Sequence, residues 1–320
     1  MEINKKKRLV SLDPREYEHP LDRETLNKLE SIPGVKPLFQ KIHKEILEKL
    51  EYIENSGSNI LLTMDNYPRV IKILNEAAKV LDIDLIPQIY VEFKGGSIKG
   101  RTSGSSKPNI VLTKSALDQL DDSELLALIG QVLGHIKSGH ALYRSISESL
   151  IDILIEVISS LTLGIGSLPA QGIQGALRKW YRMSEFTADR AGLLACQDLD
   201  ACLRLELKSA GLPKDANIES FKKSFIKQAK EFKEFDLHNV NKFMKFMSTK
   251  DLTHPYSVLR VSQLIEWEKS DNYKNILTRQ KLNILTEISS NSQFCPNCGM
   301  NLSKGDKFLE DVELKLLFIR

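Results

Sequence analysis

The chain has 320 residues, of which 42% are hydrophobic and 27% are charged, a composition typical of a soluble globular protein with a sizeable core. A formal net charge of +3 is too small to indicate nucleic-acid binding, and four cysteines are too few for a disulfide scaffold. The basic start is followed by no apolar run, so we predict no secretory signal and expect a cytoplasmic location.

In the first third of the chain, a polar stretch interrupted by prolines is followed by segments in which apolar residues recur at regular spacing. Residues 1–36 are predicted to form an N-terminal arm, because prolines and a glycine interrupt a polar sequence there. Apolar spacing of three and four then predicts helices, and alternation with β-branched residues predicts strands. The expected helices are residues 37–54, 67–81 and 114–119, and the expected strands are residues 59–63, 86–93 and 109–113.

The stretch from Glu124 to His140 has the pattern of a buried helix, and Ser123 is the expected N-cap. Gln131 and His135 are four residues apart, so they project from the same face of that helix. His140 is five residues beyond His135 and is therefore expected to point about 140° away around the axis.

Residues 150–168 are rich in Leu and Ile and are about as long as a membrane-spanning helix. Asp152 and Glu156 lie within them, and charges are costly at membrane depth. We expect a buried helix end and a Gly-rich loop with no membrane contact, and a membrane-surface role stays as an alternative.

Later helices are predicted at residues 171–197, 200–209, 217–247 and 255–267. The first of them contains Glu185 and Asp189, four residues apart and therefore on one face. The Lys-rich helix at 217–247 has an apolar aromatic face, so its lysines are expected in solvent and not on nucleic acid.

Three ordered segments resemble one family. Residues 130–140 (Gly-Gln-Val-Leu-Gly-His-Ile-Lys-Ser-Gly-His) resemble the HExxH helix of the HtpX-like and CAAX-prenyl-protease-like zinc endopeptidases, which are gluzincins. Residues 180–198 resemble the family's third-ligand helix, and residues 253–260 resemble its late His-Pro…Arg segment. The resemblance implies an α+β fold: a mainly helical, zincin-like metallopeptidase domain at residues 37–277 with a small sheet packed on the HExxH-type helix.

The resemblance also assigns roles to residues. His135 and Glu185 match the family's zinc ligands, and Asp189 matches the residue that orients a ligand from behind. His254 and Arg260 match the residues that help to hold the transition state.

The sequence departs from the family pattern at three places, one of which is Lys99-Gly100, where the family's substrate-binding edge strand usually carries Asn-Ala. Gln131 stands where the family has a histidine ligand, and an amide oxygen is a poorer zinc ligand than an imidazole. Val132 stands where the family has the glutamate that acts as general base, a group that contributes about 10²–10⁴ in rate. We therefore expect zinc to be the cofactor if there is one, bound weakly or not at all at this site.

The tail, residues 278–320, carries Cys295 and Cys298 in the spacing of half a zinc ribbon. These two cysteines are candidate metal ligands, but a closed intrachain site needs a second pair, which the remaining sequence lacks.

The prediction for function is a catalytically impaired pseudopeptidase that binds a peptide or protein segment, as a binding or regulatory module. One alternative is an active zinc endopeptidase with a rearranged site, in which His135, Glu185 and either His140 or His254 hold the metal. A membrane-surface-associated member is the other. No nucleic-acid partner is expected, and the oligomeric state stays open.

Overall fold

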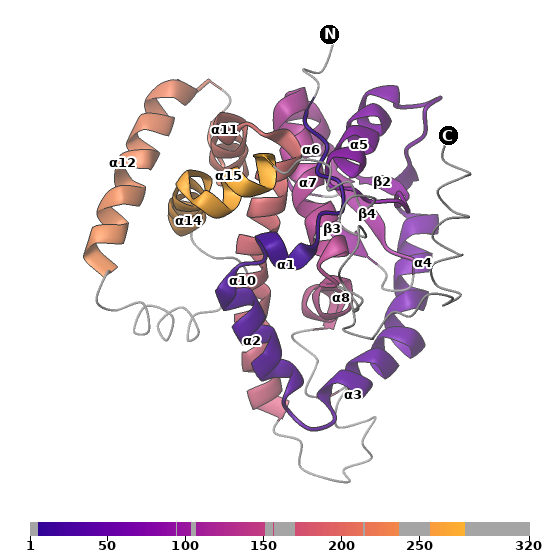
Figure 1. The fold of residues 1–320 in the computed structure, drawn as a ribbon. Coiled ribbons are helices and arrows are strands. Elements are labelled where there is room, and N and C mark those ends of the chain that lie inside the picture. The colour runs from indigo at the N-terminus through magenta and orange to yellow at the C-terminus, as the bar shows by residue number, and fades with distance from the viewer. Residues whose placement is uncertain are drawn as a thin grey trace, which may run out of the picture. The chain divides into compact units, whose positions relative to one another are not determined.

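The computed structural model describes residues 6–93, 95–103, 107–150, 156, 170–213, 215–236 and 257–278 (Figure 1). The chain divides into two compact units, Met1–Thr278 and Arg279–Arg320, and all described elements belong to the first. The helices are α1 (Pro14–Tyr17), α2 (Pro20–Glu30), α3 (Val35–Ile42), the π-helix η1 (His43–Leu47), α4 (Glu48–Gly57), α5 (Pro68–Val80), α6 (Lys114–Gln119), α7 (Asp122–Lys137), α8 (Ala141–Leu150), α10 (Ala170–Cys196), α11 (Leu199–Ser209), α12 (Ile218–Asp236), α14 (Ser257–Lys269) and α15 (Asp271–Thr278). The strands are β1 (Ile60–Leu61), β2 (Ile89–Glu92), β3 (Gly100–Ser103) and β4 (Asn109–Thr113).

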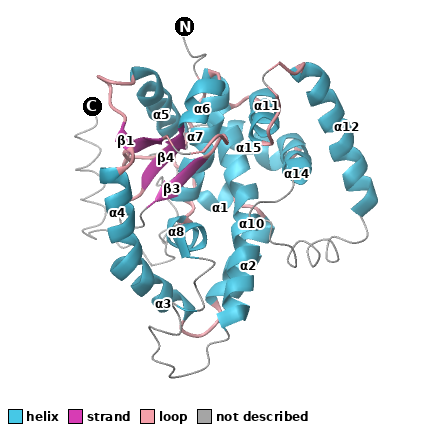
Figure 2. Cartoon of the chain, turned by 180° about the vertical axis from the view of Figure 1, so that it is seen from behind, coloured by secondary structure: helices cyan, strands magenta, loops and turns pink. Residues whose placement is uncertain are grey.

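The four strands form one sheet in the order β1-β2-β4-β3. β2 and β4 are parallel, whereas β1 pairs antiparallel with β2 and β3 antiparallel with β4. β1 and β3 are therefore the two outer strands, with β1 beside α4 and β3 beside α7 and α8 (Figure 2). The mainly helical α+β architecture with a small sheet on the central helix is the fold that the sequence predicted, and it is confirmed.

The core of the fold is the contact between α7 and α10, which small residues bring close together. A Cβ atom added at Gly134 would lie 2.3 Å from the Cβ of Ala191, and one added at Gly130 would lie 2.5 Å from the Cβ of Ala195. Because only hydrogen atoms fit at these positions, the two helix backbones pack directly against each other. This close packing fixes the position of Gln131 on α7 relative to Glu185 on α10.

Two expectations for local structure are corrected. The N-cap of α7 is Asp121 and not Ser123, because Asp121 and Glu124 form a capping box in which each side chain accepts a hydrogen bond from the other's backbone N–H. The expected N-terminal arm contains helices α1 and α2, and α2 lies along α10 (Figure 1).

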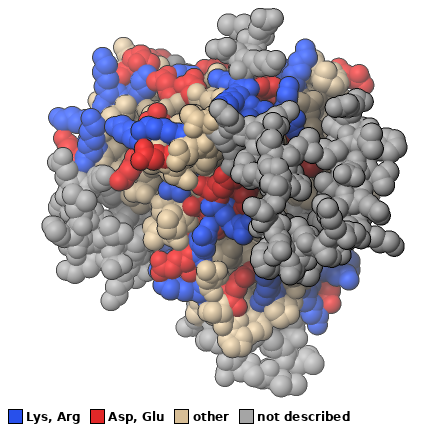
Figure 3. All heavy atoms as spheres, in the orientation of Figure 1, with Lys and Arg blue, Asp and Glu red and all other residues tan. Residues whose placement is uncertain are grey.

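The rest of the expected element order matches the structure within a few residues at each end where it is described. The predicted helix at 217–247 is α12, which is described as far as Asp236, and residues 237–247 lie outside the described part. On the face drawn in Figure 3, Lys and Arg side chains are interspersed with Asp and Glu. Within the described ranges, no helix combines the length and apolarity that a bilayer span requires.

Candidate active site

α7 places Gln131 against α10 and α14. The Nε2 of Gln131 donates to Oδ1 of Asp189 at 2.9 Å. Arg260, from α14, donates through Nε to the other oxygen of the same carboxylate at 2.9 Å and also donates through Nη2 to Oδ1. Asp189 is therefore the residue that joins three helices, and it holds the amide that stands in place of the ligand histidine.

His135 lies one turn after Gln131 and is buried. Its Nε2 is 3.7 Å from Oε1 of Glu185, and its Nδ1 is 3.1 Å from Nδ1 of His140. Burial, and next the charge of Arg144, lower the pKa of His135 well below its usual range, so the ring is neutral at pH 7. The structure thus brings His135 and Glu185 together.

The expected direction of His140 is corrected. α7 ends at Lys137, and Gly139 has a φ of +72°, which turns the chain back. The projection of 140° assumed a helix that does not extend so far, and His140 instead packs against the Nδ1 side of His135. Its own Nε2 is 3.2 Å from Oδ2 of Asp22, so His140 supports His135 from behind and does not face Glu185.

Glu185, on α10, has its carboxylate held by cations. Nη1 of Arg144, from α8, donates to Oε1 of Glu185 at 2.6 Å. Nη2 of Arg260 lies 3.6 Å from the other oxygen, Oε2. The same Arg144 donates to Glu148 at 2.8 Å and to the hydroxyl of Tyr181 at 2.9 Å, and its central carbon lies 4.3 Å from the centre of the Tyr181 ring.

A further carboxyl group, Glu206 on α11, closes the cluster. Its Oε1 is 2.8 Å from Nη1 of Arg260. Burial raises the pKa of Glu206 to about 7, although the charge of Arg260 acts in the opposite direction. Burial likewise raises the pKa of Asp189, again against the effect of Arg260. The cluster is a closed ion-pair network on four helices.

Val132, at the general-base position, lies under the outer strand β3. The side chain is 1% exposed. A Cβ atom added at Gly100 would lie 2.8 Å from Cγ2 of Val132, so the strand backbone rests on this methyl group. Hydrocarbon therefore fills the space in which the family's pattern places a carboxylate.

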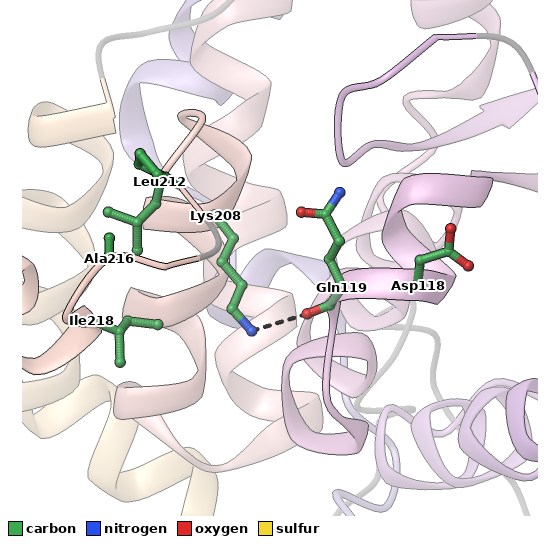
Figure 4. A pocket seen from close by; sticks show the side chains of 7 residues that line it. Asp118, Gln119, Lys208, Leu212, Ala216 and Ile218 are labelled. Carbon is green, nitrogen blue, oxygen red and sulfur yellow. Dashed lines mark hydrogen bonds between the residues drawn. The ribbon is translucent and has the colours of Figure 1, made fainter.

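Glu124, at the other end of α7, has a separate structural role. It is fully buried and accepts from Arg204 at 3.0 Å and from Lys208 at 2.6 Å. Lys208 also donates to the carbonyl of Gln119 at 3.0 Å, at the margin of a pocket of about 390 Å³ between α6 and α11 (Figure 4). Lys208 is already paired with Glu124, so its charge is not free to bind a ligand in this pocket.

Some predicted residues lie outside the described part of the chain: His254, Cys295, Cys298 and most of residues 150–168. Sequence reasoning missed Arg144, Glu206 and Asp22, all of them buried. The only available signal was that a charged side chain in an apolar helix must pair with an opposite charge when it is buried.

Comparison with known proteins places this arrangement in a family. The family model described as Peptidase family M48 matches residues 66–268, which is more than half of the chain. The chain belongs to peptidase family M48. A relative from Arabidopsis thaliana, "Plastoglobule-localized metallopeptidase 48, chloroplastic", is 28% identical over 279 residues, which cover 84% of this chain and 76% of the relative. No solved structure matches the chain.

M48 metallopeptidases are generally zinc-dependent. A catalytic zinc site uses three protein ligands at about 2.0–2.2 Å and one open position. Among the described residues, no group of three or more His, Cys, Asp or Glu is arranged to hold a metal. The residues as placed do not fit a zinc ion, because Arg144 occupies the oxygen of Glu185 that faces His135.

Proposed function

We propose that this M48 protein binds an extended peptide segment of a partner protein without hydrolysing it. The observation that carries the proposal is Val132, a buried hydrocarbon side chain directly beneath Gly100 at the general-base position. Attack of water on a peptide bond needs a base that accepts the proton of the water, and the side chain of valine has no proton-accepting group. A zinc ion, if present at all, is expected to bind weakly here, since Gln131 is the poorer ligand.

The outer strand β3 supplies the means of binding. Thr113 donates from its backbone N–H to the carbonyl of Lys99 at 3.0 Å, and these two residues are directly opposite each other. Because bonded and non-bonded pairs alternate in an antiparallel ladder, the backbone groups of Gly100, which is partly exposed, and of Thr102, which is buried, face away from β4. We infer that an extended peptide pairs with this edge by strand addition at Gly100.

The test is a binding and cleavage experiment with the full chain. A fluorescent library of octapeptides is titrated by anisotropy, and each bound peptide is then incubated with added zinc and analysed by mass spectrometry. We expect binding with no cleavage. Cleavage at any peptide bond, lost on addition of a chelator, would instead support the alternative of an active endopeptidase with a rearranged site.

N-methylation of the bound peptide provides the matched control. Methyl groups on the alternate amides that face β3 should abolish binding, whereas the same number on the intervening amides should leave it within about threefold, since only one set pairs with the strand. Equal loss from both peptides would rule out strand addition at β3.

A further inference from the structure

Arg144 is a charged side chain at the centre of the cluster that the family motif does not contain. It is 3% exposed, and its guanidinium is held by Glu185, Glu148 and the Tyr181 hydroxyl at 2.6–2.9 Å. Its central carbon also lies 4.3 Å from the centre of the Tyr181 ring. This cation cannot move aside without breaking its hydrogen bonds to two carboxylates and a hydroxyl.

Arg144 donates to the same oxygen of Glu185 that faces His135. Oε1 of Glu185 is the atom that accepts from Arg144 at 2.6 Å, and it is also the atom 3.7 Å from Nε2 of His135. In a tetrahedral zinc site two ligand atoms stand about 3.3–3.5 Å apart, as bond lengths of 2.0–2.2 Å require. His135 and Glu185 are therefore separated by nearly the distance of two zinc ligands. The positive charge beside Glu185 is the guanidinium of Arg144.

We propose that Arg144 is the resident cation of this centre: its guanidinium takes the place that a divalent metal ion would hold at Glu185, so the site is complete without metal. Arg144 has two effects here. It neutralises Oε1 of a buried carboxylate whose other oxygen lies 3.6 Å from Arg260, and it repels a dication that approaches Oε1. This proposal does not use peptide binding, so it can stand or fall independently of the function proposed above.

The test uses one substitution that introduces a histidine ligand, Gln131→His, and another that removes the cation, Arg144→Gln. Cobalt(II) serves as the probe, because its visible absorption reports the coordination of the metal and needs no activity. Equilibrium dialysis compares the wild type, Gln131→His, Arg144→Gln and the double variant. We expect the wild type and Gln131→His to bind weakly, and the double variant to bind at least about 30-fold more tightly than Gln131→His, since one neighbouring positive charge is gone.

Arg190→Gln is the matched control for loss of a positive charge near this centre. Arg190 is on α10, like Glu185, but it donates to the carbonyls of Tyr17 and Glu18, and its guanidinium lies over the ring of Trp267. Combined with Gln131→His, it should leave cobalt affinity within about threefold of Gln131→His alone. An equal gain from both arginine variants would overturn the proposal.

The proposal stays testable if Arg144→Gln does not fold. Gln131→His retains Arg144, so cobalt binding by this variant as tight as that of an intact catalytic site, in the nanomolar range, would contradict the proposal. Arg144→Lys in the same background keeps the charge and should bind cobalt no more tightly than Gln131→His. Tight binding by the lysine variant would show that charge is not what excludes the metal.

Discussion

At the scale of single residues, a hydrocarbon and an amide occupy the two adjacent positions at which the sequence departs from the motif it resembles. Val132 is packed under Gly100, and Gln131 is tied to Asp189 at 2.9 Å. Each side chain is in contact with its surroundings, since Val132 packs against the backbone of β3 and the Gln131 amide donates a hydrogen bond to Asp189. Both positions therefore contribute to folding, and changing them has a measurable cost.

We predict that Val132→Glu lowers the free energy of unfolding by about 2–4 kcal/mol at pH 7.5, because it buries a carboxylate without a partner. The loss should shrink at pH 4.5, since a buried carboxyl has a raised pKa and its neutral form is tolerated. Urea denaturation at the two pH values measures both effects. Val132→Thr, which has nearly the same shape and no charge, should show no such pH dependence.

His19 is expected to make stability depend on pH. Its Nδ1 accepts from the backbone N–H of Leu21 as the N-cap of α2, and its Nε2 is 3.2 Å from Gln263. Burial, and next the charge of Arg190, lower the pKa of His19 to about 4 from its ordinary 6.5. A protonated ring cannot accept from Leu21, so the folded chain favours the neutral form.

The sign of the effect follows from this lowered pKa. The unfolded chain takes up a proton near pH 6.5 and the folded chain only near pH 4, so the stabilisation is complete above 6.5 and is lost as the pH falls towards 4. At about 1.36 kcal/mol per unit the loss is up to about 3 kcal/mol. His19→Asn keeps an N-cap but does not titrate, so denaturation curves at pH 7.5 and 4.5 should converge in this variant. An unchanged pH dependence would contradict the assignment.

At the scale of elements, the α7–α10 contact determines the geometry of the centre. We predict that Gly134→Ala destabilises the protein by about 1–3 kcal/mol, because the new methyl group would overlap Ala191. Helix propensity alone would predict a gain of about 1 kcal/mol. Thermal denaturation distinguishes the two, and Ala191→Gly in the same chain should restore part of the loss.

Gly175 provides the control within α10. It is exposed, and nothing lies within 4 Å of an added Cβ. Gly175→Ala should therefore stabilise the protein by up to about 1 kcal/mol. If both alanine variants change stability in the same direction, close packing is not what selects glycine at Gly134.

Whether the sequence predicted a helix depends on the kind of interaction that packs the helix against the rest of the fold. α5, α7, α10 and α11 bury apolar faces, so their spacing was visible in the sequence. α2 was not predicted, because one of its anchors is Asp22, which accepts from Trp180 at 2.9 Å and from Thr187. A buried carboxylate looks like a surface residue in a sequence, and only its distant partners reveal it.

The centre was predictable to a similar extent. The family motif identified His135 and Glu185 as neighbours, and the structure brings them together. The turn at Gly139 that redirects His140 depends on one backbone angle, and Arg144 depends on contacts between α8 and α10. Neither has a periodic signal, so neither could be found without coordinates.

At the scale of the whole molecule, the N-terminal segment is part of the fold of Met1–Thr278. Leu9 donates from its backbone N–H to the carbonyl of Val80 at 2.9 Å, and Asp22 connects α2 to α10. Removal of residues 1–36 would expose the buried groups of α10 and leave Trp180 without its acceptor. We predict that a chain starting at Pro37 loses cooperative unfolding, as measured by near-ultraviolet circular dichroism during heating.

The control is a shorter deletion. A chain that starts at Lys6 keeps both contacts and should unfold at the temperature of the full chain within about 2 °C, since it loses none of the described contacts. Cooperative unfolding of the chain that starts at Pro37 would show that residues 37–278 fold independently.

The glycine-mediated contact between α7 and α10 also bears on how such a protein can diverge. Cohesion between the two helices comes from Gly130, Gly134 and Gly192, none of which takes part in chemistry. Mutations at the chemical positions can therefore accumulate over generations while the scaffold persists, provided that these three glycines stay. Descendants that have lost every reactive group would be recognised in genomes by their glycines, and a survey based on reactive residues would overlook them.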